Sequence, residues 1–187
     1  MKVIEMAQVE AQAWRNGGGV TRELLAWPDA DDWALRLSVA DIERDGPFSA
    51  FGGIDRVFAV LTGAGVRLDW PGRSVTLDAD SPSLAFDGGD PPHAALVGGA
   101  TRDLNLMLRR ERARGRLARA RPGSAWSGDA PWRGLLTPAA AQLAVDGAMP
   151  ITLPAWSLVF STTAAGQHWR LGAEPGATVY WIEATPR

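Results

Sequence analysis

The sequence predicts an all-β protein built as a sandwich or a barrel. Turn-forming residues are dense, with 21 glycines and 13 prolines among 187 residues, and they divide the chain into short apolar or alternating runs. No segment of about twelve or more residues shows the 3.6-residue apolar period of an amphipathic helix. Together these observations favour many short strands joined by tight turns.

The expected strands are runs of strand length with turn-forming residues beside them. In chain order they are residues 20–27, 33–41, 56–62, 65–70, 74–78, 103–109, 151–153, 155–161 and 177–183. Short helices are expected only near residues 46–51 and 137–144.

Two of the runs alternate with a period of two, so each has two distinct faces. In residues 33–41 a face of large apolar side chains opposes Ala34, Arg36, Ser38 and Ala40. In residues 103–108 three leucines oppose Asp103, Asn105 and Met107. The polar faces either meet water, as is usual for antiparallel sheets, or line a cavity between two apolar layers.

A loose internal echo suggests two related β units. The strand-turn-strand pattern of residues 56–70 returns weakly in residues 156–171. We expect one compact domain with approximate units 1–120 and 121–187, whose strands can interleave. The Pro-, Gly- and Ser-rich residues 121–132 are the expected connection.

Composition excludes several functional classes. A net charge of −2 and a pI of about 5.7 give no electrostatic basis for nucleic-acid or membrane binding by the whole protein. The chain has no cysteine, which excludes disulfides and zinc-thiolate sites. Its start lacks the pattern of a signal peptide, and no apolar run approaches the roughly 18 residues of a membrane span. We therefore expect a cytoplasmic protein.

The sequence shows no motif of a transition-metal site, of a bound cofactor or of a catalytic triad. Its two histidines, His93 and His168, are far apart in sequence, whereas histidine-based transition-metal sites need several imidazoles close together. There is no Gly-x-Ser-x-Gly nucleophile motif. The run Gly17-Gly18-Gly19 lacks the lysine of a phosphate loop, so it either exposes Asn16 and backbone amides to a ligand or forms a wide turn.

Seven arginines lie between Arg109 and Arg121. They could form an anion-binding strip or the solvated face of an edge strand. The absence of interleaved aromatic residues and the acidic overall charge favour the edge strand.

Four ordered motifs resemble the signatures of the HutD/Ves family. They are Trp14-Arg15-Asn16-Gly17-Gly18-Gly19-Val20-Thr21-Arg22-Glu23, Arg36-Leu37-Ser38-Val39-Ala40, Gly46-Pro47-Phe48-Ser49-Ala50-Phe51-Gly52-Gly53-Ile54-Asp55-Arg56 and Asp103-Leu104-Asn105-Leu106-Met107-Leu108-Arg109-Arg110. The last third of the chain carries no matching motif.

The resemblance implies a cupin-type (RmlC-like jelly-roll) β-barrel, arranged as a bicupin with two related β units and no bound metal. It also implies an accessory or regulatory protein of bacterial histidine utilisation, with urocanate or a formylated glutamate as the ligand. The Ves branch is linked instead with environmental stress. A homodimer formed through strand edges is compatible with the resemblance.

The resembling motifs supply residues for a pocket that binds a small carboxylate. Arg56 and Arg36 would give charge-assisted bonds to the carboxylate. Polar bonds and apolar walls would come from Asn16, Ser38, Ser49 and Asn105, and from Met107, Trp14 and Phe48, respectively. Asp55 would hold Arg56 in place, and Arg22 and Glu23 would pair either near the pocket or as a structural ion pair.

Three functions remain open at this point. The first is a non-enzymatic protein that senses or buffers a small carboxylate. The second is a metal-free isomerase or hydrolase with Glu23, Asp55 or Asp103 as general acid or base. The third is an interaction module with an unused pocket, which would show a large exposed apolar patch.

Overall fold

The computed structural model describes residues 1–174 and 176–187, which form 19 strands and one short 3-10 helix, η1 (Met6–Gln8). The all-β prediction is therefore confirmed. The two expected helices are wrong, because Gly46–Pro47 forms strand β5 and Ala141–Val145 forms strand β15. In the part of the chain that the structure describes, no helix has the length and apolar character needed to cross a membrane.

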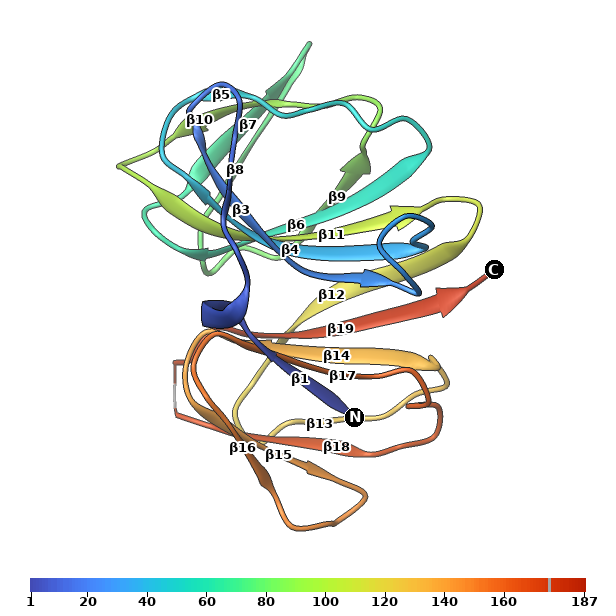
Figure 1. The fold of residues 1–187 in the computed structure, drawn as a ribbon. Helices are drawn as coiled ribbons and strands as arrows, with labels where there is room; N and C mark the ends of the chain where they lie inside the picture. The colour runs from blue at the N-terminus through green and yellow to red at the C-terminus, as the bar shows by residue number, and fades with distance from the viewer. Residues whose placement is uncertain (175) are drawn as a thin grey trace. The chain divides into compact units, whose positions relative to one another are not determined.

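The chain folds into two compact units (Figure 1). The first unit contains residues 10–114 and 186–187, and the second contains residues 1–9 and 115–185.

The first unit consists of two packed sheets. One sheet has the order β2 (Gln12–Ala13), β3 (Gly19–Trp27), β4 (Leu35–Ile42), β11 (Thr101–Arg109), β6 (Ile54–Thr62), β9 (Leu84–Asp87). The other has the order β5, β10 (His93–Leu96), β7 (Val66–Trp70), β8 (Arg73–Leu77). Ile42 and Phe58 of the first sheet form one core cluster with Val66, Leu68 and Ala94 of the second. This is the double-sheet arrangement of a jelly roll.

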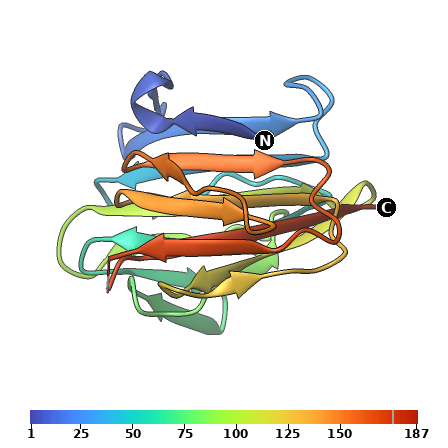
Figure 2. The same cartoon turned by 90° about the horizontal axis from the view of Figure 1, so that it is seen from below.

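The second unit repeats this plan. One sheet has the order β1 (Lys2–Glu5), β17 (Ser157–Ser161), β14 (Trp132–Thr137), β19 (Val179–Pro186), β12 (Ala113–Ala120). The other has the order β13 (Ala125–Trp126), β18 (Trp169–Ala173), β15, β16 (Ile151–Leu153). Figure 2 shows the N-terminal strand β1, in blue, beside β17, in orange, with which it pairs antiparallel.

The two units share a strand order along the chain. Strands β4 to β11 of the first unit correspond, in their order along the chain and in their pairing, to strands β12 to β19 of the second. The hairpin of residues 56–70 therefore corresponds to β14 and β15. The echo expected in residues 156–171 is wrong, because those residues form β17 and β18.

Alternation along β4 and β11 creates the face on which the candidate site lies. Leu35, Leu37, Leu104 and Leu106 are fully buried on one side of the sheet. The side chains at alternate positions point to the other side, where the second sheet of the first unit packs. The polar face thus lines a cavity of the first unit that is partly open to solvent, since 25% of the Arg36 side chain is exposed.

Part of the arginine-rich segment forms the expected edge, whereas Arg109 ends the central strand β11 and Arg112 lies in the turn before β12. Strand β12 is the last strand in its sheet order, and its Arg114 and Arg116 are exposed while Leu117 is buried. Arginines on an exposed edge discourage pairing with other chains.

Candidate functional site

A cavity of about 620 Å³ lies within the first unit. Its volume is in the usual range for a small-molecule site. All nine residues expected to bind a ligand line it: Trp14, Asn16, Arg36, Ser38, Phe48, Ser49, Arg56, Asn105 and Met107. Whether they bind a ligand stays a prediction, but the structure brings them together around one space.

Cross-strand register explains why residues distant in sequence meet here. Met107 on β11 lies opposite Arg36 on β4 and opposite Arg56 on β6. Asn105 on the same strand lies opposite Ser38 and Phe58. Because directly paired residues point to the same face, these two rows form the floor of the cavity.

Arg56 is the most deeply buried charge of the cavity, with 7% of its surface exposed. Its Nε and one terminal nitrogen both donate to Oδ1 of Asn105 at 3.2 Å. The guanidinium also lies 4.8 Å from the ring centre of Phe48 and 5.2 Å from that of Phe86. Burial, and secondarily the nearby charge of Arg36, lower the pKa of Arg56 to about 10, so the group remains a cation at neutral pH.

Arg36 supplies the second cation and has a different environment. Its Nε lies 3.4 Å from Oε2 of Glu23, and a terminal nitrogen contacts Sδ of Met107 at 3.2 Å. The rings of Trp33 and Phe51 lie 5.4 and 5.6 Å from the guanidinium carbon. Arg36 is thus partly neutralised, whereas Arg56 has no acidic partner among the contacts of the described residues.

The glycine run is a shaped turn that positions two of the lining residues. Gly17 has a φ of +67°, and the amide of Gly18 donates to Oδ1 of Asn16 at 3.0 Å. A Cβ on Gly19 would lie 2.1 Å from the carbonyl oxygen of Asp41, so only glycine fits there. Oδ1 of Asn16 is used by the turn. The side-chain amide nitrogen of Asn16 is the group that can serve a ligand.

The structure adds lining residues that were not selected from the sequence. They are Ala13, Arg15, Thr21, Ala40, Ile42, Pro47, Phe51 and Phe58. Phe51 stood within a quoted motif, and Phe58 follows Arg56 by two positions on a strand, so both carried a usable signal. Thr21 accepts a hydrogen bond from the indole Nε1 of Trp14 at 2.8 Å, a partner that only the fold reveals.

Two expected ion pairs are wrong. Asp55 does not hold Arg56, because adjacent residues on a strand point to opposite faces. Its carboxylate instead accepts from Nε of Arg110 at 2.8 Å. Arg22 does not pair with Glu23 for the same reason, since Arg22 bonds Asp41 at 3.0 Å while Glu23 pairs with Arg36.

The carboxylates considered as general acid or base do not line the cavity. Glu23 is paired with Arg36, and Asp55 is bound to Arg110. Among residues 1–174 and 176–187 no three His, Cys, Asp or Glu side chains are grouped as a metal site would require. His93 and His168 are both exposed, on or beside different sheets. The lining chemistry is therefore cationic and aromatic, which suits binding of an anion.

Asp103 continues the polar row of β11 below the cavity and is completely buried. It lies opposite Ala40, a lining residue, and accepts a hydrogen bond from Oγ1 of Thr101 at 2.7 Å. Its other oxygen, Oδ1, has no hydrogen-bond partner among the described residues. Burial, which outweighs the Thr101 bond and is reinforced by the charge of Asp41, raises the pKa of Asp103 to about 8. The group is thus held mainly as a neutral acid at pH 7.

Comparison with known proteins gives a consistent family relationship. The family model described as HutD matches residues 6–181. An uncharacterised 21.2 kDa protein in the hutC 3′ region of Pseudomonas putida is 41% identical over 106 residues, 56% of this chain and 56% of that protein. Protein Ves of Cronobacter sakazakii is 35% identical over 116 residues, 61% of this chain and 64% of its own length. The chain thus spans less than two thirds of the length of these curated relatives.

Solved structures agree over almost the whole chain. A conserved protein of unknown function from Pseudomonas aeruginosa PAO1 has a TM-score of 0.89 at 32% identity, covering 98% of both chains. HutD from Pseudomonas fluorescens SBW25 has a TM-score of 0.85 at 27% identity, covering 100% of this chain and 98% of that one. Bacillus subtilis oxalate decarboxylase shares only the fold, with a TM-score of 0.65 at 9% identity over 99% of this chain and 77% of its own. The expected cupin-type fold is confirmed.

Proposed function

The chain belongs to the HutD family, and from this premise we propose that it binds a small carboxylate metabolite without converting it. We place it as an accessory or regulatory factor of bacterial histidine utilisation. The relative in the hutC 3′ region of Pseudomonas putida and the solved HutD of Pseudomonas fluorescens support this placement.

The buried charge of Arg56 is the observation that carries the proposal. A buried cation is costly unless it is paired and hydrogen-bonded. Asn105 satisfies two of its N–H groups but brings no negative charge. A ligand carboxylate between Arg56 and Arg36 would supply the missing charge, and the planar guanidinium groups suit a carboxylate geometrically.

Urocanate and formylglutamate are the candidate ligands. Urocanate joins a carboxylate to a planar imidazole ring, which the phenyl rings of Phe48 and Phe51 could sandwich against the cavity wall. Formylglutamate has two carboxylates and an amide, which Asn16 and Ser49 could bond. Both molecules are small relative to a cavity of about 620 Å³.

Thermal unfolding of the chelator-treated protein tests the proposal. The compounds to add are urocanate, histidine, formiminoglutamate, formylglutamate and formate. At about 100 times its dissociation constant, a ligand stabilises by about 2.7 kcal/mol and should raise the melting temperature by roughly 5–10 °C. If none of the five does so at millimolar concentration, the proposed ligand class is wrong.

Matched variants locate the binding. Arg56→Ala should abolish the shift. Arg67→Ala should retain it, because Arg67 belongs to the same unit but lies on the surface, paired with Asp69. A product assay with the stabilising compound should show no turnover, and turnover would contradict the non-enzymatic part of the proposal.

A further inference from the structure

The shared strand order allows the cavity of the first unit to be compared with the same place in the second. Strand β6 corresponds to β14, β11 to β19, and β4 to β12. In the first unit these strands carry Arg56, Met107 and Arg36. The question is which side chains the second unit places there.

The second unit also has a buried arginine at this place. Arg133 on β14 has no exposed surface. Leu135, two positions further along the strand, lies in the core of the second unit, as Phe58 does in the first. Because residues two apart on a strand share a face, Arg133 and Arg56 point into their units in the same way.

The residues opposite the two arginines differ in charge. Arg56 lies opposite Met107, whereas Arg133 lies opposite Glu183. The third position completes the match, since Arg36 contacts Met107 and Arg116 contacts Glu183. The row Arg-Met-Arg of the first unit is therefore Arg-Glu-Arg in the second.

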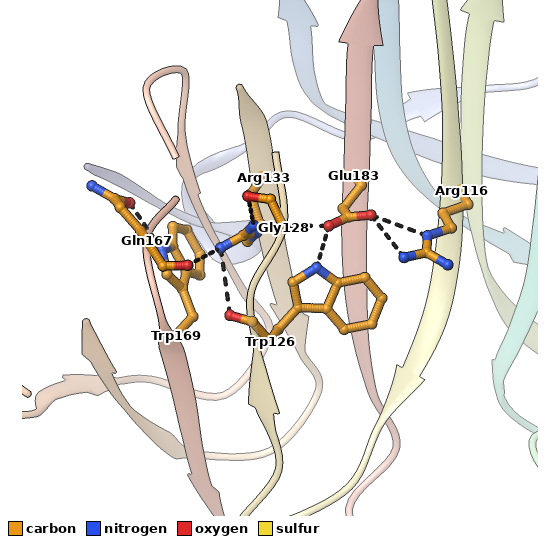
Figure 3. Close-up of polar contacts among 7 residues, drawn as sticks. All are labelled: Arg116, Trp126, Gly128, Arg133, Gln167, Trp169 and Glu183. Atoms are coloured by element: carbon orange, nitrogen blue, oxygen red, sulfur yellow. Dashed lines mark hydrogen bonds and ion pairs between the residues drawn. The ribbon is translucent and has the colours of Figure 1, made fainter. Parts of the chain in front are cut away.

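Glu183 makes the contacts that a bound carboxylate would make (Figure 3). Nε of Arg116 donates to Oε2 at 3.0 Å, and its terminal nitrogen lies 3.0 Å from the same oxygen. The indole Nε1 of Trp126 donates to Oε1, from which a terminal nitrogen of Arg133 is 3.8 Å away. Only 12% of the Glu183 side chain is exposed.

The remaining bonds of Arg133 fix its position independently of Glu183. Its terminal nitrogens donate to the carbonyl oxygens of Gln167 at 2.8 Å and Gly128 at 3.1 Å. Its Nε has no hydrogen-bond partner among the described residues. The guanidinium should therefore stay in place when the glutamate is shortened.

We propose that Arg116, Trp126 and Arg133 form a second carboxylate site, which the side chain of Glu183 occupies permanently. Shortening Glu183 to alanine opens this site to a small free carboxylate such as acetate, which replaces the atoms removed. Only the comparison with the cavity of the first unit rests on the proposed function. The site in the second unit stands on its own contacts.

Acetate rescue tests the site directly. The background is Arg56→Met, which removes the buried cation of the cavity. Glu183→Ala in this background should melt at a lower temperature, because Arg133 loses its counter-charge. Acetate at about ten times its dissociation constant should then restore roughly 3–5 °C relative to chloride of equal ionic strength.

Two controls decide the result. The Arg56→Met parent, which keeps Glu183, should not respond to acetate beyond the chloride control. Acetamide, a neutral molecule of the same shape, should not rescue Glu183→Ala. Equal acetate responses in the parent and the double variant, or equal rescue by acetamide, would overturn the proposal.

A reciprocal pair of variants tests the comparison without any ligand and without touching Glu183. Met107→Glu creates in the first unit the Arg-Glu-Arg row found in the second. The new carboxylate should therefore pair with Arg36 and Arg56. This variant should melt above Met107→Gln at pH 7, and the difference should shrink progressively as pH falls below about 4, because pairing lowers the pKa of the carboxyl in the folded state below that in the unfolded chain. A Met107→Glu protein less stable than Met107→Gln at pH 7 would show that the two rows are not equivalent.

The two tests separate this inference from the proposed function. If Met107→Glu and acetate rescue behave as expected but no histidine-pathway compound stabilises the wild type, the carboxylate sites stand and the metabolite assignment fails.

Discussion

Replacing Arg56 with methionine should abolish carboxylate binding while the unliganded protein keeps its stability to within about 1 kcal/mol. Methionine fills a similar elongated space without charge. The expectation follows from the cost of holding an unpaired guanidinium inside the first unit.

The magnitude follows from the surroundings of Arg56. Burial lowers its pKa to about 10, well below that of a free arginine. Holding the charge therefore costs the folded state about 3 kcal/mol. Removing Arg56 relieves that cost but leaves Oδ1 of the buried Asn105 without its donor, at about 1–3 kcal/mol. It also removes the contacts with Phe48 and Phe86, at about 0.5–1 kcal/mol each. The opposing effects nearly cancel.

Arg133→Met is the matched comparison in the second unit. Arg133 donates to three backbone carbonyls, so its loss leaves several buried acceptors without donors and removes one of the two cations near Glu183, which keeps its bonds to Arg116 and Trp126. The expected loss is about 3–5 kcal/mol. Urea unfolding monitored by tryptophan fluorescence measures both variants, and titration calorimetry measures binding.

Two results would refute this reasoning. A loss above about 3 kcal/mol in Arg56→Met would show that Arg56 serves the fold more than a ligand. Undiminished carboxylate binding by the same variant would show that the counter-charge is not the basis of recognition.

Three further variants test other parts of the first unit. Asp103→Asn should stabilise the protein at pH 8 by on the order of 3 kcal/mol, and the gain should shrink toward pH 4. Because of the raised pKa, Asp103 of the folded wild type keeps a proton that it releases in the unfolded chain. The wild type therefore loses stability as pH rises from about 4 to 8. A difference in urea midpoint between the two proteins that does not change with pH would contradict this. Gly19→Ala should lower the free energy of unfolding by more than about 2 kcal/mol, because the new Cβ meets the Asp41 carbonyl. Gly52→Ala, whose Cβ faces open space, should lower it by less than about 1 kcal/mol. Similar losses in the two variants would argue against the close approach at Gly19. Phe51→Ala should weaken carboxylate binding about tenfold in calorimetry, since its ring lies beside Arg36 and Arg56; unchanged affinity would remove this wall from the site.

The residues of the candidate site that could be predicted are those that belong to local sequence patterns. Period-two alternation assigned Arg36 and Ser38 to one face, and the glycine run at residues 17–19 pointed to its neighbours Trp14 and Asn16. Phe58 was missed because a phenylalanine on a β-strand is ordinarily core. The ion pairs predicted for Asp55 and Glu23 were wrong because each joined two residues adjacent in sequence. Adjacent residues on a strand point to opposite faces of the sheet, so their side chains cannot pair.

By itself, the sequence determined that the chain is all-β and has only two histidines, and it identified nine of the residues that line the cavity. Alternation, turn residues and motifs depend only on residues near one another in the chain, so they can be recognised without the tertiary structure. Only the tertiary structure decided that Arg36, Met107 and Arg56 form one row and that Arg116, Glu183 and Arg133 form its counterpart. Those rows depend on register between strands far apart in the chain, and the packing of whole sheets sets that register.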